Sequence, residues 1–172
     1  MSGGLPPGRW EVQPERSRVG FRVKHLGFAS AEGNFESFAG TIEVGDGEIA
    51  AAGAVQVASV RTGEEQRDSL LASHLFFGAE EHPEMTFASS AVRQRGDRLS
   101  IEGELTIGGE TRTLRLDAHV AEQDGGSARL SARGELSRRD FALRFRGPMS
   151  AGNRGVGDRV SIELDLALGR VA

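Results

Sequence analysis

Residues 98–108 read Arg-Leu-Ser-Ile-Glu-Gly-Glu-Leu-Thr-Ile-Gly, and this stretch decides the fold of the chain. Every second position is apolar or small: Leu99, Ile101, Gly103, Leu105 and Ile107. Because successive side chains of a strand point to opposite faces, these positions form one face of a β-strand. The stretch therefore predicts a strand with one apolar and one polar face.

Five stretches of the chain share this period, and small residues recur on the apolar face. Residues 128–136 repeat it with Ala128, Leu130, Ala132, Gly134 and Leu136. A solid core would place large aliphatic side chains at such positions. Small residues there indicate that space is left inside. We predict an antiparallel barrel with an apolar interior that holds a ligand, and we assign Gly103, Leu105, Ala132 and Gly134 to its wall.

Composition narrows the function further. The chain has 172 residues, a size that suits one domain. A net charge of -4 with scattered Lys and Arg argues against nucleic acid as a partner. There is no Cys, and no apolar run approaches the ~20 residues that span a bilayer. The first ten residues lack the apolar core of a secretory leader. We expect a soluble, cytoplasmic protein without stable membrane insertion.

Turn signals punctuate the chain about every 8–12 residues, which is typical of an all-β domain. We take residues 1–8 as a flexible N-terminus and residues 9–170 as a single domain. A short excursion is expected over residues 27–38. The predicted strands cover residues 9–13, 17–24, 41–45, 49–60, 85–94, 99–107, 113–121, 128–137 and 159–168.

One segment breaks the strand pattern. Thr62-Gly63-Glu64-Glu65 has the form of a capping box, in which Thr62 would bind a free backbone donor at a helix start. Residues 65–72 then suit a helix of two to three turns. The apolar pair Phe76-Phe77 follows it. We predict that this helix and the Phe pair cover one end of the barrel.

Few residues of the chain suggest catalysis or metal binding. His74 and His82 lie near acidic residues but at none of the compact metal-ligand spacings, so we expect no metal site. His25 continues an inward-facing series and is either a hydrogen-bonded structural residue or a catalyst. Arg67 and Asp68 are either a solvated helix face or the groups that meet a polar ligand head. No nucleophile elbow is present.

The ordered motifs resemble the YceI-like family of bacterial proteins, a lipocalin-like group described as polyisoprenoid-binding. They are Trp10-Glu11-Val12, residues 17–26, Gly33-Asn34-Phe35, Thr62-Gly63, Gln66-Arg67-Asp68, Phe76-Phe77, residues 86–89, residues 103–112 and residues 157–160. The resemblance covers nearly the whole chain, from Trp10 to Leu168. One departure stands at Ala142, where the family usually has Gly, and we expect this Ala to tighten or straighten a strand.

The resemblance implies an all-β fold, an extended eight-stranded antiparallel lipocalin-like barrel with a short capping helix and an apolar tunnel. The polar mouth of the tunnel would involve His25, Arg67 and Asp68. The residues near the apolar chain of the bound ligand would be Phe21, Phe35, Phe38, Leu71, Phe76, Phe77 and Phe87.

We therefore predict a non-enzymatic carrier of a long apolar molecule: a polyisoprenoid, an isoprenoid quinone or a fatty acyl chain. No cofactor is required beyond this ligand. A homodimer would suit apolar cargo, although no interface is indicated. Two alternatives stay open: a lipid- or amide-acting enzyme that uses His25 and Asp68, and a stress-related structural protein.

Overall fold

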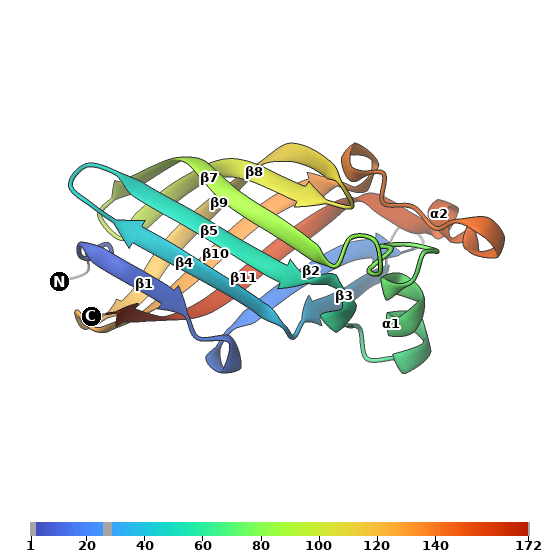
Figure 1. The fold of residues 1–172 in the computed structure, drawn as a ribbon, viewed down its shortest axis with the longest axis horizontal. Coiled ribbons are helices and arrows are strands. Elements are labelled where there is room, and N and C mark those ends of the chain that lie inside the picture. The colour runs from blue at the N-terminus through green and yellow to red at the C-terminus, as the bar shows by residue number, and fades with distance from the viewer. Residues whose placement is uncertain (1–2, 26–28, 172) are drawn as a thin grey trace.

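The computed structural model of the protein describes residues 3–25 and 29–171, with His25 described by its backbone alone. The strands that close into a ring are β1 (Gly8–Val12), β4 (Phe38–Val44), β5 (Ile49–Gln56), β7 (Glu84–Arg95), β8 (Arg98–Ile107), β9 (Glu110–Gln123), β10 (Ser127–Ser137) and β11 (Val156–Val171). Neighbouring strands are antiparallel, and pairing of β1 with β11 closes the ring (Figure 1). The predicted eight-stranded barrel is confirmed.

The wall is extended at one end by strands that continue past breaks. The 3-10 helix η1 (Pro14–Arg16) separates β1 from β2 (Arg18–His25), and both strands pair with the long β11. At this break Ser17 Oγ donates to the carbonyl of Gln13 at 2.7 Å and accepts from the amide of Ala167 at 2.8 Å. The hydroxyl thus replaces ladder hydrogen bonds where the strand bends.

Two further strands complete the extension. β3 (Ala29–Phe35) pairs with β2 along its whole length, whereas β6 (Val60–Arg61), which follows the 3-10 helix η2 (Val57–Ser59), pairs with β3 through only two residues. In the ring itself β7 pairs with β5, and no pairing joins β7 to β3 or β6 in the described chain. The strand pairing of the barrel wall is therefore incomplete beside β3.

The N-terminal segment closes the opposite end of the barrel, where both chain termini lie (Figure 1). The Leu5 side chain is 3% exposed, and its amide donates to Gln94 Oε1 at 2.8 Å. Trp10 is fully buried, and its ring nitrogen donates to the carbonyl of Pro6 at 3.0 Å. The segment that we expected to be flexible thus contributes Leu5 to the core.

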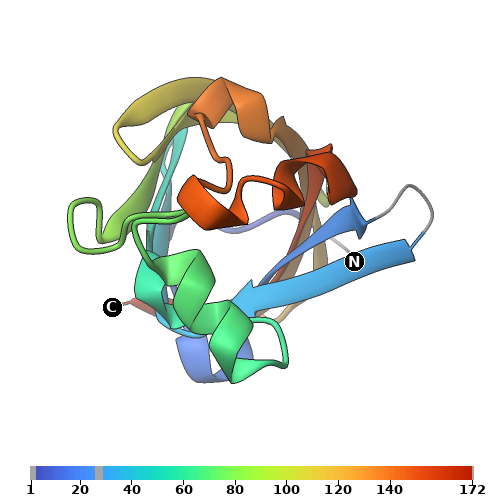
Figure 2. The same cartoon turned by 90° about the vertical axis from the view of Figure 1, so that its right-hand side faces the viewer.

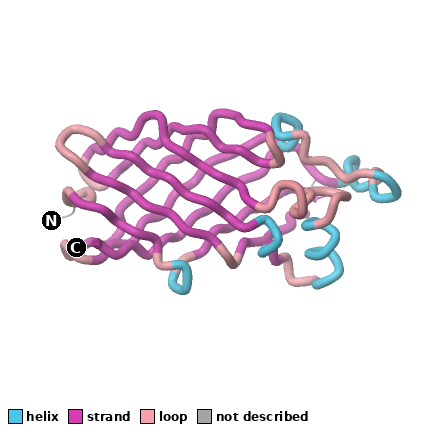
Figure 3. The backbone as a smooth tube through the Cα atoms, viewed as in Figure 1, coloured by secondary structure: helices cyan, strands magenta, loops and turns pink. Residues whose placement is uncertain are grey.

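Short helices gather at the end of the barrel that lies away from the chain termini, and we call it the open end (Figures 2 and 3). Here lie α1 (Glu65–Ala72), η3 (Arg138–Phe141), η4 (Gly147–Met149) and α2 (Gly152–Gly155). We call residues 138–155 the lid segment. It contacts the chain after α1 through the amide of Arg146, which donates to the carbonyl of Leu75 at 2.9 Å. The predicted capping helix is confirmed. Within the described chain, no helix has the length and the apolar character needed to cross a membrane.

Two local predictions are wrong. Residues 27 and 28 lie outside the described residues, and residues 29–38 do not form the expected excursion, because Ala29–Phe35 is strand β3 and Phe38 begins β4. Ala, Ser, Gly and Asn have little preference for strands, and full pairing with β2 overrides that preference. The capping box also does not form: α1 starts after Glu64 without a side-chain cap, and Thr62 binds Asp68 instead.

The expectation at Ala142 is wrong as well. No strand runs there, because η3 follows β10 directly. Ala142 has a φ of 53° and a ψ of 31°, and among the described residues it is the only non-glycine residue with a positive φ. A side chain in this left-handed conformation is strained, since Cβ approaches the following carbonyl. The turn after η3 thus explains why Gly suits this position.

Candidate functional site

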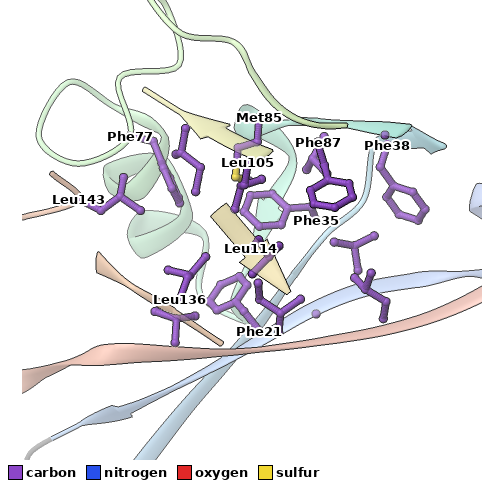
Figure 4. A pocket seen from close by; sticks show the side chains of 18 of the residues that line it. Phe21, Phe35, Phe38, Phe77, Met85, Phe87, Leu105, Leu114, Leu136 and Leu143 are labelled. Carbon is purple, nitrogen blue, oxygen red and sulfur yellow. The ribbon is translucent and has the colours of Figure 1, made fainter. Parts of the chain in front are cut away.

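A cavity of about 700 Å³ lies inside the barrel, between the core of the closed end and the helices of the open end. Figure 4 shows aromatic and aliphatic side chains that converge on it from several strands. Its polar lining is restricted to Glu32, Thr41, Thr62, Glu64, Gln66, Thr86 and the two arginines Arg67 and Arg138. An almost wholly apolar wall of this size is typical of a site for an apolar small molecule.

Phe rings form a continuous row from the wall to the lid segment. The ring centroids of Phe21 and Phe35 lie 5.6 Å apart, and those of Phe35 and Phe77 lie 6.1 Å apart. Phe76 follows at 4.9 Å from Phe77 and packs on Phe145 of the lid segment at 4.7 Å. These tilted and edge-to-face contacts are favourable for aromatic pairs. Without a hydroxyl, the rings present a dry surface to the cavity.

The structure brings most of the predicted site residues to one cavity. Those on its wall are Phe21, Phe35, Phe38, Arg67, Leu71, Phe76, Phe77, Phe87, Leu105 and Ala132. Asp68, Gly103 and Gly134 do not line it. The side chain of His25 lies outside the described residues. Their roles in binding remain predictions.

The space-leaving role predicted for Gly103 and Gly134 is wrong. A Cβ added at Gly103 would lie 2.4 Å from the carbonyl oxygen of Ala88 and 2.6 Å from the ring of Phe87. The β7–β8 register shifts between Ser89 and Ala91, so a bulge brings the β7 backbone close to Gly103. At Gly134 a Cβ would lie 2.6 Å from the carbonyl oxygen of Arg115. At both positions the absence of a side chain allows the backbone of the neighbouring strand to approach closely, and neither glycine faces open space.

Five of the eight polar lining residues come from β3, from α1 or from the loop before α1. Glu32 comes from β3, while Thr62, Glu64 and Arg67 come from α1 and the loop before it. A second, polar pocket shares Glu32, Thr62 and Arg67 with the cavity and adds Arg22 and Ser30. The polar pocket therefore adjoins the apolar cavity beside β3, and we call this place the portal.

Arg67 is held at the portal by its own loop. Its Nε donates to Thr62 Oγ1 at 2.9 Å, and its Nη2 donates to the Thr62 carbonyl at 2.9 Å. Thr62 is anchored in turn by Asp68, whose Oδ1 accepts from the Thr62 amide at 2.8 Å and from its hydroxyl. Asp68 thus positions Arg67 through Thr62 without reaching the cavity.

Arg138 is a functional candidate that our sequence analysis missed. Its side chain is buried, lines the cavity, and donates to the carbonyls of Leu143, Val156 and Gly157 at 2.7, 2.9 and 2.8 Å. Burial lowers the pKa of this guanidinium, and the nearby carboxylate of Asp158 opposes that effect. The period-two pattern could have identified it, because Arg138 continues the inward-facing series of β10 two residues beyond Leu136.

Asp158 supports the base of the lid segment. Its carboxylate accepts a hydrogen bond from the Ser137 hydroxyl and another from the Arg139 amide at 2.9 Å. The Ser137 bond, the Arg139 amide and the charges of Arg139 and Arg138 together lower the pKa of Asp158. Asp158 therefore stays ionised over a wider acid range than a free carboxylate.

Other lining residues come from strands whose pattern was clear. β11 contributes Val160, Ile162, Leu164 and Leu166, which are the apolar face of the predicted strand 159–168. The lid segment adds Leu143, Phe145 and Met149, and its sequence carries no period that marks them. Among the described residues, no three His, Asp or Glu side chains gather as metal ligands would.

Solved structures share this barrel. BcnA of Burkholderia cenocepacia superposes with a TM-score of 0.80 at 25% identity, covering 91% of this chain and 98% of that one. A polyisoprenoid binding domain from Saccharophagus degradans superposes with a TM-score of 0.76 at 14% identity, covering 94% and 98%. At this low identity, the second likeness concerns the fold alone.

Sequence comparison identifies the family. Protein YceI of Escherichia coli O157:H7 is 33% identical over 143 residues, which cover 78% of this chain and 74% of that protein. The UPF0312 protein plu2095 of Photorhabdus laumondii is 29% identical over 139 residues, covering 76% and 72%. The family model of the YceI-like domain matches residues 10–168. The resemblance inferred from the motifs is confirmed, and the chain belongs to the YceI-like family.

Proposed function

We propose that this protein binds one long apolar molecule in its barrel, such as a polyisoprenoid, an isoprenoid quinone or a fatty acyl chain, and acts as a carrier without a catalytic step. The observation that carries this proposal is the cavity of about 700 Å³ with its almost wholly apolar wall. The Saccharophagus degradans domain of the same fold is named for polyisoprenoid binding, which agrees with the proposal.

Burial of the ligand's hydrocarbon chain provides the binding free energy. Each methylene removed from water contributes about 0.8 kcal/mol, whereas association costs about 4–15 kcal/mol in lost freedom. A chain of roughly fifteen carbons therefore gains about 12 kcal/mol, and much shorter chains gain too little to bind well. The Phe row from Phe21 to Phe145 offers a rigid surface along which such a chain can lie.

The first test is native mass spectrometry of the protein purified from its own host, followed by organic extraction of whatever is released on unfolding. We expect a stoichiometric lipid or quinone. A protein that is empty, and that also fails to bind added isoprenoids and fatty acids, would contradict the proposal.

A matched pair of variants places the ligand inside the barrel. Ala51 lines the cavity, while Ala50, its neighbour on β5, is exposed on the outer face. Ala51→Phe fills part of the cavity and should reduce both co-purified and added ligand. Ala50→Phe adds the same ring outside and should leave ligand binding unchanged. Equal ligand content in the two variants would contradict binding in the cavity.

A further inference from the structure

The portal combines two arginines with a gap in the strand pairing of the barrel wall. Arg22 of β2 and Arg67 of α1 both line the polar pocket that shares Glu32, Thr62 and Arg67 with the apolar cavity. β3, which lies between them, pairs with β6 only through Asn34 and Phe35. The portal therefore lies where the described chain leaves the edge of β3 from Ala29 to Gly33 without a strand partner.

Arg67 presents free donors at this place. Its Nε and Nη2 are fixed on Thr62, whereas Nη1 makes no hydrogen bond among the described residues. The nearest carboxylate oxygen, Glu64 Oε2, lies 3.7 Å from Nη1. A guanidinium has five N–H donors and no acceptor, so it requires an acceptor group as partner. Because Thr62 holds the side chain in place, little rotamer freedom remains to be lost on binding.

The acidic partners of the two arginines are exposed. Arg22 pairs with Glu32, whose side chain is 54% exposed, and Arg67 lies near Glu64, whose side chain is 63% exposed. Solvent screens such pairs, and they contribute little to stability. A ligand anion whose tail is already anchored in the cavity is held at high local concentration and can compete for these donors.

We propose that the portal binds an anionic oxygen head group, a carboxylate or a phosphate monoester, whose apolar chain fills the cavity. This assignment rests on the proposed binding function and adds the ligand class. Arg67 and Arg22 donate charge-assisted hydrogen bonds to the head group, which are about twice as strong as neutral ones. Asp68 acts as a positioning residue that holds Thr62 and, through it, Arg67.

The test compares ligands that differ only in the head group. Palmitic acid is paired with hexadecanol, and geranylgeranyl phosphate with geranylgeraniol, at a pH above the pKa of each acid. We expect the anion of a pair to bind about tenfold more tightly than its alcohol, which is the gain from one charge-assisted hydrogen bond. Preference within the first pair alone identifies a carboxylate site, and within the second alone a phosphate site.

Variants assign the preference to residues. Arg67→Gln and Arg22→Gln should each reduce the ratio of anion to alcohol affinity, because the loss of a charged donor weakens binding of the anion more than binding of the alcohol. Arg61→Gln is the matched control: Arg61 is equally exposed and pairs with Glu36, but does not line the portal. This control should keep the wild-type ratio.

The outcomes separate the two proposals. Equal binding of anion and alcohol by the wild-type protein would overturn the head-group site and leave the carrier function standing. Binding of none of the four ligands by a protein that also purifies empty would overturn the carrier function itself. A preference that survives in both Arg67→Gln and Arg22→Gln would overturn the assignment to these arginines.

Discussion

Arg138 donates a hydrogen bond from Nη2 to the carbonyl of Val156, with 2.9 Å between the two atoms. This bond joins the first residue of the lid segment to the residue that follows its end. Two further bonds, to Leu143 and Gly157, use the same guanidinium. One buried side chain therefore satisfies three main-chain carbonyls, one inside the lid segment and two at the start of β11.

Replacement of Arg138 should loosen the lid segment. Arg138→Met keeps an unbranched apolar stem but removes the guanidinium and leaves buried carbonyls unpaired, and we expect a loss of at least about 2 kcal/mol in the free energy of unfolding. Arg139→Met is the control, because that side chain is 88% exposed, and it should change stability by less than about 0.5 kcal/mol. Denaturant titration measures both. Equal midpoints would show that the guanidinium does not hold the lid segment.

Ala142→Gly should stabilise the protein by about 1 kcal/mol, because it removes the strain of a left-handed Ala. Ala151→Gly is the opposite control: Ala151 has ordinary helical angles, φ -62° and ψ -26°, so Gly there only adds freedom to the unfolded chain. Thermal unfolding should shift upward for the first variant and downward for the second. A downward shift for both would contradict the strained conformation of Ala142.

Gly103→Ala tests whether this glycine leaves space or makes room for β7. A Cβ at this position would collide with main-chain atoms of Ala88 and Ser89, so we expect a loss of about 1–3 kcal/mol. Gly126→Ala meets no atom closer than 3.9 Å and should be nearly neutral. Chemical denaturation of both variants gives the comparison. A neutral Gly103→Ala would restore the interpretation that the position faces open space.

Acid unfolding should depend on Asp158. Its pKa in the folded protein is lowered from 3.8, so its contribution to stability is present above pH 3.8 and is lost as the pH falls through the lower, folded value. Asp158→Asn should therefore be less stable than the wild-type protein near neutral pH, and the two should converge under acid.

Asp140→Asn is the control for this titration. Asp140 is exposed and makes no hydrogen bond or ion pair among the described residues, so its variant should follow the wild-type curve. A difference between Asp158→Asn and the wild-type protein that stays constant down to the lowest pH would contradict the lowered pKa.

Period-two patterning was sufficient to predict the barrel, because it records which face of each strand is buried. The segments 99–107, 128–137 and 159–168 all form strands close to their predicted bounds. The same pattern placed Leu105 and Ala132 on the inner face, where both line the cavity. Strand β3 escaped prediction because its small and polar residues have little strand preference, and only pairing with β2 makes it a strand.

Other features depend on contacts between distant parts of the chain. The sequence predicts that Gly103 leaves space inside the barrel, but the bulge of the neighbouring strand β7 lies against it. The sequence places Asp68 on the predicted helix, but only the structure shows that its carboxylate accepts hydrogen bonds from Thr62. The portal arises because β6 pairs with β3 over two residues only, which no local pattern reveals. Alternation along a strand is a local property that residue order records, whereas the volume inside a barrel depends on which strands meet and how closely.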